Sequence, residues 1–219
     1  MIMTPRVRKF ALIAHVCSSV GGLGAVAAFL VLAITGLSSR NPDTVRSAYL
    51  AMDLLGLLVI VPLILASLLT GIIQSLGTPW GLLRHYWVVV KLLLTILASA
   101  LLLLHQYMAV AMAAKRVLAA AAGRLPNAGG LGTQLVVDAS LAILVLLTAT
   151  TLAVYKPRGL TGYGRRKEED RNTSLPQVRM VATVEQTNLG YRIFIVTLAA
   201  IVVVAVVVHL TGLAGGHGG

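Results

Sequence analysis

The sequence predicts an all-α fold, a polytopic transmembrane helical bundle with a four-helix core and a fifth C-terminal transmembrane helix. Composition is the first observation: 58% of the residues are hydrophobic and 11% are charged, with a mean hydropathy of +0.89, which excludes a water-soluble domain. The second is a set of long stretches almost without charge, each close to or above the roughly 20 residues that cross a bilayer. The third is physical: backbone polar groups in hydrocarbon must pair within their own segment, which makes each span a helix.

The expected spans are set by the positions of the charged residues. Four stretches contain no charge and one carries a single aspartate near its end: 10–39, 54–83, 92–114, 193–219, and 133–155 with Asp138. The first stretch follows a basic N-terminus, as a secretory signal does, but it is longer than the about 7–15 residues of a signal's apolar core. We therefore expect a retained first transmembrane helix.

Three parts are expected along the chain. Residues 1–157 would form the four-helix transmembrane bundle, residues 158–191 a flexible basic cytoplasmic linker, and residues 192–219 the fifth transmembrane helix with a short external tail. The linker contains GRRKEEDRNTSLP, in which charges of both signs and Pro176 disfavour a stable fold.

The basic residues are unevenly divided between the two sides of the predicted bundle. One side carries Arg6, Arg8, Lys9, Arg84, Lys156, Arg158, Arg165, Arg166, Lys167, Arg171, Arg179 and Arg192, and the other carries Arg40, Arg46, Lys115, Arg116 and Arg124. Short loops rich in Lys and Arg stay in the cytoplasm. We therefore expect the N-terminus in the cytoplasm and the C-terminus outside.

The formal net charge of +11 raises the question of nucleic acid as a partner. These charges are spread over segments that flank helices, and the sequence has no basic domain interleaved with aromatic residues to hold a strand. We expect no nucleic acid as a partner, because the lipid bilayer and its anionic headgroups are the simpler choice. Cys17 is the only cysteine, which excludes an intramolecular disulfide and a cysteine-based metal cluster.

Lys91 lies inside the third predicted span, four residues after Trp87. An ionisable group within a membrane-spanning helix marks a functional site by default. A rise of about 1.5 Å per residue places Lys91 and His15 in the cytoplasmic half of the membrane. The alternative for Lys91 is that its amine extends to the headgroups, and the alternative for His15 is a hydrogen bond to a backbone carbonyl.

A second polar layer is expected in the outer half of the membrane, with Asp53, His105 and Asp138. Lys91 and His105 would lie about 21 Å apart along the helix axis, so no single cofactor atom could contact both. His105 and Asp138 could form a structural pair, and Asp53 could be hydrated at the outer interface.

Two stripes at heptad spacing predict that these polar groups face the interior of the bundle. They are Lys91, Ala98, His105 and Met112 on the third span, and Asp53, Ile60, Ser67 and Gln74 on the second. Residues seven apart share a helix face to within a slow drift, and faces that contact lipid would be uniformly apolar.

A copper site is a further hypothesis. The stretch HQYMAVAM places His105, Met108 and Met112 within two turns near the outer surface. Imidazole and thioether groups are the ligands that Cu(I) prefers. The alternative is that these methionines pack.

The stretches AHVCSSVGGLG and LLTGIIQSLGTPWGLLRHYWVVVKLLLT resemble the CopD-like superfamily of four-helix integral membrane proteins. That superfamily includes copper-resistance CopD domains, HemJ-type protoporphyrinogen oxidases and several predicted integral-membrane families of uncharacterised function, which this sequence resembles most. The resemblance covers roughly residues 10–155 and implies a multi-pass protein of a bacterial-type cytoplasmic (inner) membrane.

The resemblance also implies candidate site residues. In the HemJ-type enzymes the functional pair is an early-helix His and a Lys in a W-x-x-x-K context, and the bundle binds haem b. The matching positions here are His15, Trp87 and Lys91. His15 would be the axial candidate, and Lys91 would offset a propionate or another carboxylate.

The leading hypothesis is therefore an inner-membrane bundle that holds haem b or another redox or metal group in a polar interior. One alternative is a non-catalytic membrane subunit or scaffold without a cofactor, and another is copper or small-solute transport, in a homo-oligomer or with a membrane partner. No motif of a soluble enzyme is present in the sequence. The sequence leaves open whether the protein is an enzyme and names no catalytic residue.

Overall fold

The computed structural model describes residues 3–77, 81–121, 124–155 and 160–173. These residues form helices and the segments that join them, without a β-strand in the described part. The predicted fifth transmembrane helix at 192–219 lies outside the described residues, as does the second half of the predicted linker.

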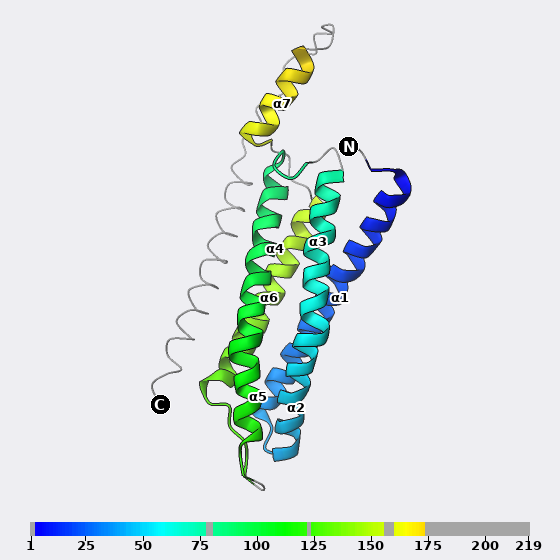
Figure 1. Ribbon diagram of the computed structural model, residues 1–219. Coiled ribbons are helices and arrows are strands. Elements are labelled where there is room, and N and C mark those ends of the chain that lie inside the picture. The colour runs from blue at the N-terminus through cyan, green and yellow to red at the C-terminus, as the bar shows by residue number, and fades with distance from the viewer. Residues whose placement is uncertain (1–2, 78–80, 122–123, 156–159, 174–219) are drawn as a thin grey trace.

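Four helical segments are long and apolar enough to cross a membrane, which agrees with the predicted four-helix core and is compatible with an integral membrane protein. The first is α1 and the last is α6, while the second and third each consist of two α-helices joined by a π-helical turn (Figure 1). Their bounds are α1 Pro5–Ser38, α2 Pro42–Leu55, η1 Gly56–Ile60, α3 Val61–Gly77, α4 Tyr86–His105, η2 Gln106–Val110, α5 Ala111–Leu118 and α6 Gly130–Tyr155.

The second span begins at Pro42, well before the charge-free stretch that was expected to define it. Asn41 caps the helix, since its Oδ1 accepts hydrogen bonds from the backbone N–H groups of Asp43 at 2.9 Å and Thr44 at 3.3 Å. Pro42 occupies the first helical turn, where its missing N–H costs nothing. The helix therefore extends past the apolar stretch and carries its charged first turns at one end of the bundle.

The four spans pack as the corners of a square. Helix α1 packs chiefly against α3 and α6, and α4 also packs against α3 and α6, so α1 and α4 lie on one diagonal (Figure 1). The N-terminal end of the bundle holds the start of α1 and the segment 81–85, and the opposite end holds the segments 39–41, 119–121 and 124–129. A side chain that joins α1 to α4 must cross the interior of the bundle.

The two π-helical turns meet inside the bundle, and Gln106 of η2 contacts Asp53 at the end of α2. Gln106 is buried, and its Nε2 donates to the backbone oxygen of Asp53 at 3.2 Å and to its Oδ1 at 3.1 Å. Gly56 makes room for this contact, because a Cβ there would overlap the Gln106 amide. The interpretation of Asp53 as a merely hydrated interfacial residue is therefore corrected: its carboxylate has a partner on the neighbouring span.

A short helix, α7 (Gly162–Thr173), lies within the linker that was predicted to lack a stable fold. Thr161 begins it, since its Oγ1 accepts from the backbone N–H of Gly164 at 3.0 Å. The backbone N–H of Thr161 donates to the oxygen of Arg84 at 3.0 Å, and Arg84 also pairs with Glu168 at 3.9 Å. This part of the linker is thus helical, because its first turn is capped and attached to the segment between the second and third spans.

Candidate functional site

His15 and Lys91 meet inside the bundle. The distance between Lys91 Nζ and His15 Nε2 is 3.2 Å. Because α1 and α4 occupy opposite corners, the contact crosses the interior between α3 and α6. The Lys91 amine therefore points toward the neighbouring helices, and the alternative in which it extends to the headgroups does not describe this arrangement.

The hydrogen bonds of His15 fix the position of its ring proton. Its Nδ1 lies 3.0 Å from the backbone oxygen of Ser67 and 3.2 Å from Thr70 Oγ1. A carbonyl oxygen can only accept, so we assign the ring proton to Nδ1. Nε2 then presents a lone pair and accepts a hydrogen bond from the Lys91 amine. The imidazole in this arrangement is neutral. The bond from Nδ1 to the Ser67 carbonyl also agrees with the alternative considered for His15, a hydrogen bond to a backbone carbonyl.

Further polar groups of α1 and α3 surround the pair. Ser19 Oγ lies 2.7 Å from Ser67 Oγ, and Gln74 Nε2 donates to the backbone oxygen of Ala11 at 2.8 Å. Ser67 and Gln74 belong to the heptad stripe predicted for the second span, and both point to α1. We call this set the His15–Lys91 cluster, and its members are His15, Ser19, Ser67, Thr70, Gln74 and Lys91.

The cluster contains no carboxylate. Among the acidic side chains that the structure describes, each has a partner elsewhere: Asp43 with Arg46, Asp53 with Gln106, Asp138 with His105 and Glu168 with Arg84. An unpaired ammonium in a membrane interior is unfavourable. Lys91 is therefore either uncharged or ready to receive an anion that these side chains do not supply.

Trp87 lies one helical turn before Lys91 and serves to hold α4 in place. Its ring is buried with Val88, Leu94 and Leu152 in a small apolar cluster between α4 and α6. The centroid of the His85 ring lies 6.5 Å away. This packing fixes the height and rotation of the helix turn that carries the Lys91 amine.

The resemblance implies haem b at His15, and the described residues fit it in one respect only. The bond from Nδ1 to a carbonyl orients the ring as in histidines that bind metals. The other nitrogen, however, is engaged by Lys91, and Gly71 packs so close that a Cβ there would lie 3.2 Å from His15 Cε1. This arrangement leaves no open position for an iron at Nε2, and haem binding stays a prediction.

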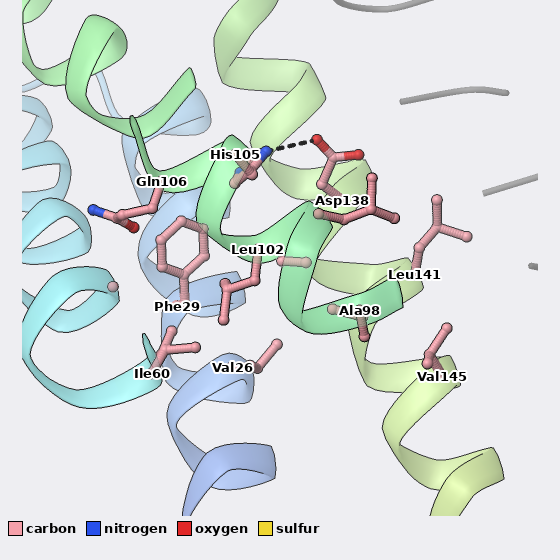
Figure 2. A pocket seen from close by; sticks show the side chains of 14 residues that line it. Val26, Phe29, Ile60, Ala98, Leu102, His105, Gln106, Asp138, Leu141 and Val145 are labelled. Atoms are coloured by element: carbon pink, nitrogen blue, oxygen red, sulfur yellow. Dashed lines mark ion pairs between the residues drawn. The ribbon is translucent and has the colours of Figure 1, made fainter. Parts of the chain in front are cut away.

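The second polar layer lies toward the opposite end, where His105 of α4 faces Asp138 of α6 (Figure 2). The distance from His105 Nδ1 to Asp138 Oδ2 is 3.1 Å, and the two side chains are 11% and 12% exposed. The layers deduced from helix position are thus reproduced by contacts, with His15 and Lys91 in one and His105 and Asp138 in the other.

The copper hypothesis placed His105 with Met108 and Met112. In the structure His105 pairs with Asp138, while Met108 and Met112 are 44% and 38% exposed. The described residues include no group of three or more His, Cys, Asp or Glu that could hold a metal ion. The copper site stays a prediction without a contact that joins its three residues.

The stripe on the third span ends before Met112 for a structural reason. Lys91 reaches the interior, and Ala98 and His105 line a cavity there. The π-helical turn η2 follows directly, and its extra residue changes the angular phase of every later side chain. Sequence reasoning also missed Gln106 and Thr70 as partners, because nothing in their spacing reveals a π-helical turn or a histidine on another span.

Comparison with known proteins found no matching family model, no matching curated protein and no matching solved structure. The resemblance to the CopD-like superfamily therefore stays a prediction, carried by the residues of α1 and of the segment that joins α3 to α4.

Proposed function

We propose that this protein is a multi-pass inner-membrane protein that binds an anionic, lipid-soluble molecule at the His15–Lys91 cluster. The observation that supports this proposal is the direction of the Lys91 amine, which lies 3.2 Å from a neutral imidazole in the bundle interior. The N-terminal end of the bundle faces the cytoplasm in this proposal, in accord with the uneven division of basic residues.

The charge of the Lys91 amine gives the physical reason for expecting an anionic ligand. A buried cation is compensated when an anion lies beside it, whereas a buried cation alone is costly. The hydrogen bond to His15 holds the amine while no anion is bound. A bound carboxylate or phosphate is a stronger partner than a neutral imidazole, so the amine turns to it by rotation about the single bonds of its side chain.

Two sources could supply such an anion. One is the propionate of haem b, which the CopD-like resemblance implies and which would bring one-electron chemistry when bound. The other is the headgroup of an acidic phospholipid. The first source additionally requires that His15 Nε2 become available to the iron, whereas the second requires only the Lys91 amine.

The test compares the two sources in one preparation. The protein is purified in mild detergent from cells with full haem supply, its visible spectrum is recorded oxidised and reduced, and bound lipids are identified by mass spectrometry. A Soret band lost in both His15→Ala and Lys91→Leu supports haem. A colourless protein that retains acidic lipid, with the lipid lost in Lys91→Leu and kept in His15→Ala, supports a lipid.

A matched control is Lys115→Leu, which removes an exposed lysine at the opposite end of the bundle. It should leave pigment and bound lipid unchanged. If the unaltered protein carries neither pigment nor acidic lipid, the proposal is wrong and the non-catalytic scaffold is favoured. Copper or small-solute transport gains no support from contacts within the described ranges.

A further inference from the structure

A cavity of about 130 Å³ lies between α1, η1, α4 and α6, apart from the His15–Lys91 cluster. Figure 2 shows its apolar walls, formed by side chains such as Val26, Phe29, Leu102 and Val145. His105 and Asp138 lie on its boundary and bring an imidazole and a carboxylate to it. The lining is therefore almost wholly apolar, with a narrow polar side at His105 and Asp138.

The volume of the cavity limits what it can hold. Apolar cavities of about 150 Å³ in proteins accept a benzene molecule, so this cavity is about the size of one six-membered ring. It is well below the about 300–1,000 Å³ of pockets that enclose larger ligands. Neither His15 nor Lys91 lines the cavity, and the inference is thus independent of the haem hypothesis.

The polar side limits the chemistry of that ring. The Asp138 carboxylate accepts hydrogen bonds, and the His105 Nδ1 lies 3.1 Å from it. A ring hydroxyl that reaches this side can donate to a carboxylate oxygen. A ligand with a full charge would have to lose its hydration against the apolar walls, and a plain hydrocarbon ring would leave the polar pair unused.

We infer that this cavity binds the ring of a lipid-soluble phenol or quinol, with the ring hydroxyl directed to the His105 and Asp138 pair. A ligand of this class dissolves in the hydrocarbon around the helices. Along α4 the cavity extends from Ala98 to His105, so its near end lies about 10 Å from Lys91 and its polar end about 21 Å. Binding here is therefore distinct from anion binding at the His15–Lys91 cluster.

Fluorine NMR of the purified protein in detergent tests the inference with two probes of equal ring size, para-fluorophenol and fluorobenzene. We expect the phenol to bind about tenfold more tightly, which corresponds to one hydrogen bond. A quinol with an isoprenoid tail should displace it. Equal binding of the two probes would overturn the assignment of the polar side.

The Ala142→Leu variant fills the cavity from α6 and should abolish binding of both probes. The matched control, Leu144→Ala, changes a side chain on the same helix that is 52% exposed and does not line the cavity; it should bind as the unaltered protein does. Phenol binding that survives Ala142→Leu would show that this cavity is not the site.

Asp138→Leu should keep ring binding and lose the preference for the phenol. If this variant fails to fold, the Ala142→Leu result still decides whether the cavity is the binding site. Lys91→Leu should leave phenol binding unchanged, so that a failure here and a failure of the proposed anion site give different results.

Discussion

The two polar layers of the bundle differ in how their charge is balanced. His105 faces a carboxylate of the adjacent helix at 3.1 Å, so that layer holds an imidazole and its carboxylate partner within the protein. Lys91 faces a neutral imidazole across the diagonal at 3.2 Å, and the carboxylates of Asp43, Asp53, Asp138 and Glu168 are engaged elsewhere. The first arrangement is complete within the protein, whereas we propose that an anion from outside the described residues completes the second.

Their positions in the bundle differ as well. The His105 layer lies beside the two π-helical turns and an apolar cavity. The His15–Lys91 cluster lies among regular α-helices and hydroxyl side chains of α3. The comparison teaches that two histidines of one bundle can differ in their partner, which is a carboxylate for His105 and an amine for His15.

The largest expected effect is on the pair of His105 and Asp138. His105→Leu leaves the Asp138 carboxylate without its imidazole, and removing one partner of a buried pair costs about 3–5 kcal/mol. The free energy of unfolding in mixed detergent micelles measures this. His105→Leu combined with Asp138→Leu should recover most of the loss, and Met108→Leu, which changes a 44% exposed neighbour, should be neutral. If His105→Leu left the free energy of unfolding unchanged, the distinction between the two layers would be wrong.

Gly56→Ala should have the next largest effect. The added Cβ would overlap the Gln106 amide, and overpacking of this kind costs about 1–3 kcal/mol. Gln106→Ala in the same chain should relieve part of the loss. The control is Gly24→Ala, where a Cβ meets no atom within 4 Å. Thermal unfolding followed by circular dichroism gives both values, and equal shifts for Gly56→Ala and Gly24→Ala would contradict the proposed contact.

Lys91→Leu should change stability by only about 1 kcal/mol, because it removes one hydrogen bond to His15 and also removes a cation without a carboxylate. The same micelle titration used for His105→Leu measures it. A loss as large as that of His105→Leu would mean that Lys91 has a structural counter-charge, and the comparison between the two layers would then fail.

The smallest effect is expected at the N-terminal end of the bundle. Thr161→Val removes the hydroxyl that caps α7 and contacts the segment between the second and third spans. Loss of an N-cap costs about 1 kcal/mol locally, so amide hydrogen exchange over residues 162–173 should become several times faster. Thr148→Val, which removes a hydroxyl bonded to its own helix, is the control. Unchanged exchange in α7 would show that the cap does not hold the helix.

Sequence reasoning found the four spans, since charge-free stretches of this length in a chain of this composition are confined to a bilayer. It also found His15, Lys91, His105 and Asp138 and sorted them into two depths, because helix rise converts residue number into height. It missed the early start at Pro42, the helix α7 and the partner of Asp53. These depend on a cap, on backbone bonds to a distant segment and on a π-helical turn, none of which alters hydropathy.

The sequence by itself predicted four helices apolar enough to cross a membrane and the height of each polar group along the bundle, because hydrophobicity and helix rise are properties of one segment at a time. The tertiary structure alone decided which of those groups meet. It placed α1 and α4 on one diagonal, which turns Lys91 to His15, and it brought α4 beside α6, which joins His105 to Asp138. The rotation of each helix and the neighbours against which it packs depend on how several helices pack together. Hydropathy along one helix carries little information about either.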